Sequence, residues 1–227
     1  MVRTIGSVIA LVVSFAAAGA DAPGISNTEA VNGLKQALAD GSAAAVAQLG
    51  VENGFFKNPK VRIPLPPALQ RIESALRFAG MRKQADDLVL AMNRAAEAAV
   101  PEAKALLVES IRNMSIQDAK GILTGGDTAA TEYFRRTTHT RLAQRFLPIV
   151  KKATDQVGLA EQYNSLAGQA AQLGLIKRDE STIEGYVTQK ALDGLYLMIA
   201  EQEKSFRQNP LGAASDIVKR VFGSVRR

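Results

Sequence analysis

The stretch that decides the fold reads STIEGYVTQKALDGLYLMIAEQEKSF and spans residues 181–206. It opens with Ser181 and Glu184, whose spacing is that of a capping box, in which a hydroxyl and a carboxylate satisfy the first free amides of a helix. The positions expected on the inner face then recur every three or four residues: Val187, Ala191, Leu195, Met198, Ile199, Gln202 and Phe206. This spacing predicts one long amphipathic helix that ends at Asn209 and Pro210.

Residues typical of helix starts and helix ends also occur along most of the rest of the chain. A capping box at Ser26 and Glu29 opens a helix that ends at Gly50, and Pro66 and Pro67 suit the first turn of a helix ending at Gly80. Further helices are expected over residues 82–100, from 101, from 115 to 125, from 128 with a kink or restart at Pro148, over 158–174 and around 217–222. The prediction is an all-α fold, a single irregular bundle of about nine helices.

One segment, residues 58–66, departs from the helical pattern. In NPKVRIPLP, three apolar residues alternate with Lys60, Arg62 and two prolines, a period of two that requires an extended backbone. One interpretation is a strap laid over the helices with the apolar residues in the core, and we favour it. The other is an edge on which a partner strand docks, and its candidate residues are Val61, Arg62, Ile63 and Leu65.

The first twenty residues are typical of a secretory leader. Arg3 precedes an apolar run over residues 5–15 and small residues up to Ala20, so we expect a signal peptide, residues 1–20, cleaved after Ala20. A buried apolar helix or an uncleaved membrane anchor is the alternative. The prediction is a periplasmic protein, and the chain has no cysteine to carry a lipoprotein anchor or a disulfide. The rest, 21–227, is expected to be one helical domain with short mobile ends at 21–25 and 224–227.

The charge pattern limits the classes of partner. The net charge of +6 suggests attraction to anionic surfaces, but the charges are interspersed, as on an ordinary solvated surface. Aromatic residues make up only 5% of the chain and no reading motif is present, so we expect no nucleic-acid partner. No cofactor or metal is predicted.

Catalytic chemistry is hard to assemble from this sequence. His139 is the only histidine, so a site with two imidazole ligands is excluded, and no nucleophile-elbow, zinc or phosphate-loop motif occurs. A hydrolase that uses Glu97 or His139 is the least favoured hypothesis. The glycines at 125 and 126 precede a helix whose free amides would bind an anion, but capping by Asp127 is favoured there.

Three polar strings are the candidate ligand-binding residues. Each places polar side chains three or four residues apart on a predicted helix: Asn93, Arg94 and Glu97; Tyr133, Arg135, Arg136 and Thr137; Gln189, Lys190 and Asp193. The favoured interpretation is interhelical ion pairs that fix the register of the bundle. The functional interpretation is that Arg94, Arg135, Arg136 and Lys190 converge on a carboxylate or phosphate group.

Five strings, in the same order along the chain, carry a family resemblance. They begin at Asn58 (NPKVRIPLP), Met92 (MNRAAEAAVPEAK), Ile122 (ILTG), Thr131 (TEYFRRTT) and Tyr186 (YVTQKALDGL). From about Asn32 to Phe222 the chain resembles a family of exported Gram-negative proteins grouped as domain of unknown function family 4197. The resemblance implies an envelope location and a helical fold, and it implies no activity, substrate or catalytic residue.

These observations lead to a ranked set of hypotheses. The first is a helical envelope protein that acts as a binding or interaction module for an anionic or amphiphilic ligand, such as a lipid or an acyl metabolite. The second is a structural or chaperone-like protein that docks an envelope partner through the extended segment. The sequence does not favour an enzyme.

Overall fold

The structure is a computed structural model that describes residues 26–155, 157–172 and 181–209. Within these ranges all regular elements are helical and no strand is present, which confirms the all-α prediction. The leader (1–20), both predicted mobile ends and the helix predicted around 217–222 lie outside the described residues.

The helices of the described residues follow one another along the chain, and the non-helical residues 50–66 join the first helix to the second. They are α1 (Asn27–Leu49), α2 (Pro67–Arg71), α3 (Glu73–Phe78), α4 (Arg82–Ala99), the 3-10 helix η1 (Val100–Glu102), α5 (Ala103–Arg112), α6 (Ile116–Thr124), α7 (Ala129–Thr154), α8 (Gly158–Gln172) and α9 (Ile183–Gln208). Seven of the α-helices have nine residues or more. The expected number of about nine is reached, in the part described, only by including α2 and α3, which have five and six residues.

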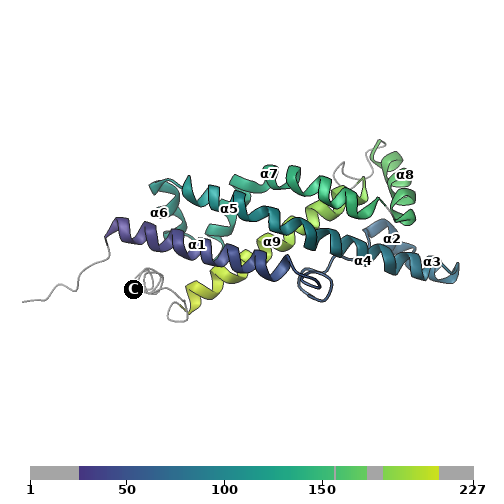
Figure 1. Ribbon diagram of the computed structural model, residues 1–227, viewed down its shortest axis with the longest axis horizontal. Coiled ribbons are helices and arrows are strands. Elements are labelled where there is room, and N and C mark those ends of the chain that lie inside the picture. The colour runs from purple at the N-terminus through teal and green to yellow at the C-terminus, as the bar shows by residue number, and fades with distance from the viewer. Residues whose placement is uncertain (1–25, 156, 173–180, 210–227) are drawn as a thin grey trace, which may run out of the picture.

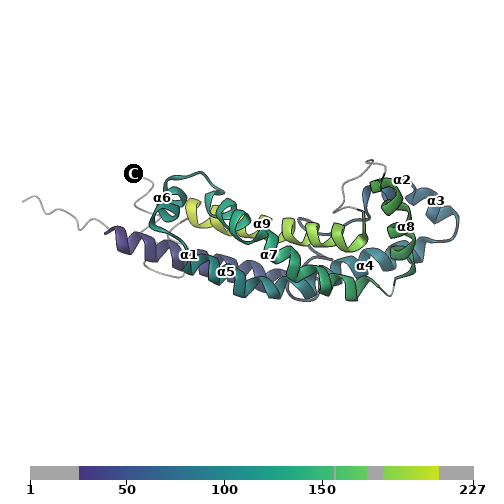
Figure 2. The ribbon, with the colours of Figure 1, turned by 90° about the horizontal axis from the view of Figure 1, so that it is seen from above.

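The helices form a long, narrow bundle (Figure 1). The succession α4, η1 and α5 runs along most of its length, and α7 and α9 run in opposite directions beside it. One end of the bundle holds α1, α5, α6 and the end of α9, and at the other α2, α3 and α8 gather near the start of α4, as Figure 2 shows from above. The central helix α7 packs mainly against α9 and α4.

The interior is filled by the faces that α4, α7 and α9 turn toward one another. Met92, Phe134, Phe146 and Tyr196 are among the largest fully buried side chains. The inner stripe predicted for α9 is buried from Val187 to Ile199, and Gln202 and Phe206 near its end are half-buried. The stripe is wider than predicted, because α9 packs on several neighbours and also buries residues outside it, such as Tyr186 and Leu192.

Helices α1, α6 and α9 begin close to where the sequence predicts, and side chains cap their first turns. Complete capping boxes form at Ser26 with Glu29 and at Ser115 with Asp118. At α9 the N-cap is Thr182, whose hydroxyl accepts from the Gly185 amide at 3.0 Å. The box predicted for Ser181 and Glu184 is therefore wrong by one residue. Glu184 lies on the buried side of α9 and instead accepts hydrogen bonds from other helices.

Two helix predictions need correction. The helix expected over residues 67–80 is broken at Ile72, whose side chain is 45% exposed and does not share the buried face of Leu69. Pro148 does not restart α7, which is continuous through it. Pro148 and Gln144, whose carbonyl loses its helical partner, are both exposed, so water can satisfy that carbonyl.

The extended segment, residues 58–66, is called the strap below. Its apolar side chains belong to the core, because Val61, Ile63 and Leu65 are 7%, 1% and 4% exposed. This burial agrees with the favoured interpretation, a strap, and removes the apolar edge that the alternative, docking of a partner strand, requires. Of the four docking candidates only Arg62 is exposed.

Candidate functional site, a groove between the strap and α9

The strap is held by Asn93 of α4. The Asn93 side-chain oxygen accepts from the Ile63 amide at 2.8 Å, and its amide nitrogen donates to the Ile63 carbonyl at 2.8 Å and to the Val89 carbonyl at 2.7 Å. The side chain is fully buried and all its hydrogen-bonding groups are used. Asn93 therefore pairs with the strap as a neighbouring strand would.

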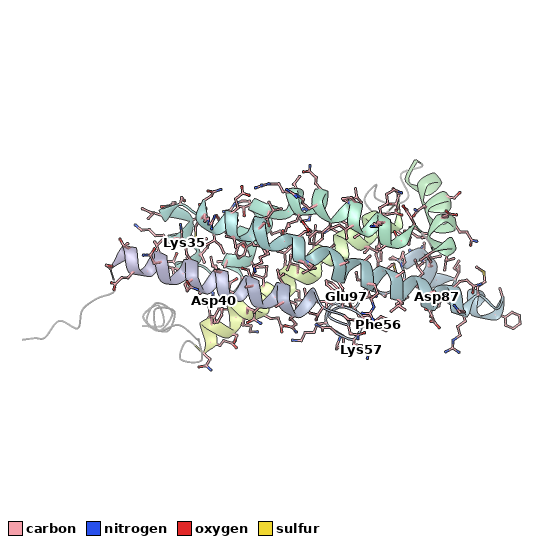
Figure 3. The ribbon with its side chains drawn as sticks, viewed as in Figure 1. Lys35, Asp40, Phe56, Lys57, Asp87 and Glu97 are labelled. Atoms are coloured by element: carbon pink, nitrogen blue, oxygen red, sulfur yellow. The ribbon has the colours of Figure 1, made fainter. Side chains whose placement is uncertain are left out.

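Glu97, one turn further along α4, holds the loop before the strap. One carboxylate oxygen accepts from the amides of Phe55 and Phe56, both at 3.0 Å, and the other accepts from Arg94 at 2.5 Å. Arg94 also donates to Glu52 and Asn53, each at 3.0 Å. Figure 3 shows Glu97 beside the loop that carries Phe56 and Lys57.

These contacts decide what the first polar string does. Glu97 is 5% exposed and both its oxygens are occupied, so it offers no free carboxylate for hydrolysis. Asn93 and Glu97 are committed to the loop and strap, and Arg94 is committed to Glu97 and the loop. They hold the strap and the loop before it, and none of the three lines the groove between the strap and α9.

On its other side the strap lies directly on α9, and Gly194 allows this close approach. A Cβ atom at Gly194 would lie 2.8 Å from the Phe55 ring and 3.2 Å from Val61 Cβ, which is closer than side chains normally pack. About two turns earlier on α9, the Tyr186 hydroxyl donates to the Pro64 carbonyl at 3.3 Å. The strap and α9 thus form two walls with a fixed spacing.

A groove of about 390 Å³ lies between these walls. Its lining includes Lys60, Arg62 and Pro64 on the strap, Pro67 and Gln70 on α2, and Tyr186, Lys190, Asp193 and Leu197 on α9. Two prolines and Leu197, which is 41% exposed, supply apolar surface. The charged lining residues of the groove are Lys60, Arg62, Lys190 and Asp193.

Two of the three cations have no carboxylate partner among the described residues. Lys60 pairs with Glu201, and Asp193 pairs with Arg135 of α7 at 3.4 Å and accepts from Gln189 at 3.2 Å. The Arg62 guanidinium instead lies 5.3 Å from the centroid of the Phe56 ring.

The second such cation, Lys190, has its ammonium 5.8 Å from the centroid of the Tyr186 ring. Cation–π contacts position a cation without neutralising it. Arg62 and Lys190 therefore remain available to an anion in the groove.

Three residues of the second polar string, Tyr133, Arg136 and Thr137, line a smaller pocket between α5, α6 and α7. The Tyr133 hydroxyl donates to the Ser110 carbonyl at 2.7 Å, and the hydroxyls of Ser110 and Thr137 are 2.7 Å apart. Arg136 pairs with Asp118 at 3.2 Å. The Ser115 hydroxyl, helped by Arg136, lowers the pKa of Asp118. Because Arg136 is already paired, this pocket has less to offer an anion.

The predicted convergence of Arg94, Arg135, Arg136 and Lys190 is not what the structure displays. Arg94 faces the loop before the strap, Arg136 faces α6, and Arg135 bridges to Asp193 while its guanidinium lies 4.6 Å from the centroid of the Tyr196 ring. What the fold brings together is Lys190 and Asp193 with Arg62. Sequence reasoning had placed these in two separate hypotheses.

The other groove residues were missed as a set. Pro67, Gln70, Tyr186 and Leu197 carry no polar motif, and the strap is more than 100 residues from α9 along the chain. The sequence does show two local features: cations that alternate with apolar residues in the strap, and polar residues beside the apolar face of α9. Their pairing is a property of the fold.

The start of α7 also differs from expectation. The amides of Ala130 and Thr131 donate to the buried carboxylate of Glu203 on α9, both at 3.0 Å. Thr128 is the N-cap residue and its side chain makes no capping bond. The expected cap by Asp127 is wrong, and an anion is already supplied to these amides by Glu203 itself.

His139 lies half-buried on α7, where its ring stacks on Tyr196 with the centroids 6.3 Å apart. No cluster of three or more His, Asp or Glu side chains suited to a metal ion occurs in the described part of the chain. No helix of that part is long and apolar enough to cross a membrane.

Comparison with models of known protein families identifies a family for this chain. The profile of a family described as "Protein of unknown function (DUF4197)" matches residues 24–223. Searches of curated proteins and of solved structures found no match.

Proposed function

We propose that this chain, which belongs to the DUF4197 family of unknown function, is an exported binding module for an anionic amphiphile. The ligand lies in the groove between the strap and α9. The observation that carries the proposal is that Arg62 and Lys190, on opposite walls of one groove, have no carboxylate partner among the described residues.

The two cations suit an anionic head group. An arginine guanidinium presents a planar fork that matches a carboxylate or a phosphate, and a lysine ammonium adds a compact charge beside it. Asp193 lines the same groove, but its charge is offset by Arg135. The groove therefore keeps a positive potential along the walls that carry Arg62 and Lys190.

The apolar part of the lining suits a short hydrocarbon chain. Pro64, Pro67 and Leu197 offer carbon surface within the groove, and Leu197 would bury its exposed fraction against a ligand. A purely polar anion would leave that surface in water. The combination favours a fatty acid or an alkyl phosphate over a free phosphate ion.

The location belongs to the same proposal. A leader over residues 1–20 would deliver residues 21–227 to the periplasm, where anionic amphiphiles are released from membranes. N-terminal sequencing of protein purified from the envelope checks this part, and a mature chain that starts at Asp21 is expected. A chain that retains Met1 would contradict it.

Ligand binding is tested with dodecyl phosphate below its critical micelle concentration, with dodecanol for comparison. At saturating dodecyl phosphate we expect a rise in Tm of about 5 °C or more and a one-to-one complex by native mass spectrometry. Dodecanol should give neither, because it lacks the charge that Arg62 and Lys190 bind.

The matched variants are R62Q with K190Q and, as the control, R145Q with K152Q, which removes two exposed cations of α7 outside the groove. The groove pair should lose the Tm rise and the complex, and the control pair should keep both. Equal binding by the two double variants would disprove the proposed site.

A further inference from the structure

We propose that the end of the bundle formed by α2, α3 and the turn into α4 docks on an anionic lipid bilayer. This segment, residues 67–83, is called the tip. Figures 1 and 2 place α3 at the extreme end of the long axis in both views. Phe78, the last residue of α3, is 97% exposed, and Ile72 is 45% exposed.

The backbone fixes Phe78 outside the core. Gly80 has a φ of 79°, a conformation that glycine adopts readily, and it turns the chain from α3 into α4. The next residue, Met81, returns to the core, where it is partly buried. The turn therefore separates an inward side chain from an outward aromatic ring only three residues earlier.

The charges around this ring favour an anionic surface. By sequence, residues 71–83 contain four cationic residues and one acidic residue. The side chains of Arg82 and Lys83 are 71% and 84% exposed, and their partners are Asp86 at 3.8 Å and Asp87 at 2.6 Å on the same helix. Such exposed pairs contribute little and are readily exchanged for phosphate groups.

The shape of the tip argues for a bilayer over a protein partner. A stable protein interface needs roughly 800 Å² from each side, whereas the large apolar side chains exposed on the tip, among those that the structure describes, are one ring and one aliphatic side chain. An interfacial anchor needs only a bulky apolar side chain that enters the acyl boundary and cations that remain at the head groups.

The tip also connects to the groove, because Pro67 and Gln70 of α2 line it. Docking at the tip would hold the groove beside the bilayer. The inference does not require the groove to be occupied, and the R62Q/K190Q variant should bind vesicles through the tip as wild type does.

The chain has no tryptophan, so Phe78→Trp creates a single fluorescent probe at the tip. With vesicles of 70% phosphatidylethanolamine and 30% phosphatidylglycerol, its emission should shift to the blue and be quenched by brominated lipids. With phosphatidylcholine vesicles it should not shift. The control is Ile116→Trp, which places the probe at a 65% exposed position at the other end of the bundle and should stay unshifted.

Vesicle co-sedimentation gives an independent measurement. Phe78→Ser should weaken binding to the anionic vesicles about tenfold or more, and Ile116→Ser should bind as wild type does. Equal binding by F78S and wild type would overturn the proposal. A blue shift of F78W that appears without vesicles and grows with protein concentration would overturn it as well, because a second copy would then cover the tip.

Discussion

At the scale of single residues, the polar side chains that the sequence singles out on α4 hold the strap and the loop before it. Asn93, Arg94 and Glu97 are spaced for one side of a helix, and the sequence places them among alanines, which predicts burial or close packing. Their partners are not predictable locally, because Asn93 binds backbone groups of Ile63, 30 residues away, and Glu97 binds amides more than 40 residues away. The sequence indicates that these groups need partners and does not reveal which ones.

Removing the Asn93 amide tests that structural role. Asn93→Leu leaves the amide and the carbonyl of Ile63 buried without partners, so the free energy of unfolding should fall by about 2–5 kcal/mol. Urea denaturation followed by circular dichroism measures it. The control is Asn113→Leu at an exposed position, which should change the free energy by less than about 0.5 kcal/mol. Equal effects of the two substitutions would contradict the proposed role of Asn93.

A second residue-scale prediction concerns Tyr196. Burial raises the pKa of this hydroxyl, which is hydrogen-bonded to Thr138 at 2.9 Å. The native state therefore holds the phenol proton more tightly than the unfolded state. Stability is fully present below the ordinary tyrosine pKa of about 10 and is lost as the pH rises further.

Tyr196→Phe removes this titration. At pH 7 the variant should be less stable than wild type by about 1 kcal/mol, the value of the lost hydrogen bond. The difference should narrow as the pH rises above about 10. Urea midpoints measured between pH 7 and 11 check this, and a gap that widens with pH would contradict it.

At the scale of elements, the first residue of a helix was predictable where the capping residues lie within its first turn. The boxes at Ser26 and Ser115 form because hydroxyl and carboxylate lie within one turn. The predicted capping was wrong at two helices. At α7 a residue distant in sequence binds the first amides, and at α9 the expected capping carboxylate binds another helix instead. Glu203 of α9 binds the amides that open α7, and Glu184 is drawn toward Asn164 of α8.

The seating of the strap on α9 yields an element-scale prediction. Gly194→Ala places a methyl group against Phe55 and Val61, so the strap should be pushed away from α9. Amide hydrogen exchange at residues 58–66 should become faster, and dodecyl phosphate should bind more weakly because Arg62 moves away from Lys190.

Gly121→Ala is the matched control. A Cβ atom at Gly121 of α6 meets nothing within 4 Å, so this change should be neutral or stabilise the helix by up to about 1 kcal/mol. If Gly194→Ala leaves exchange in the strap unchanged, the close approach does not position that wall of the groove.

At the scale of the whole molecule, fold class was predictable and the site was not. The fold class follows from the helical spacing of apolar residues and from residues that start and end helices, and both recur from Ser26 to Asn209. The groove depends on two elements that are distant in sequence and on one glycine that sets their spacing. The resulting molecule is a rod with a cationic groove on its side and an aromatic tip at one end.

The central claim is that Arg62 and Lys190 together hold the head group of an anionic amphiphile. A crystal structure of the protein with dodecyl phosphate tests it most directly. Phosphate oxygens are expected at hydrogen-bonding distance from both side chains, with the alkyl chain along Pro64, Pro67 and Leu197. A phosphate bound at any other place, with the groove empty at saturating ligand, would contradict it.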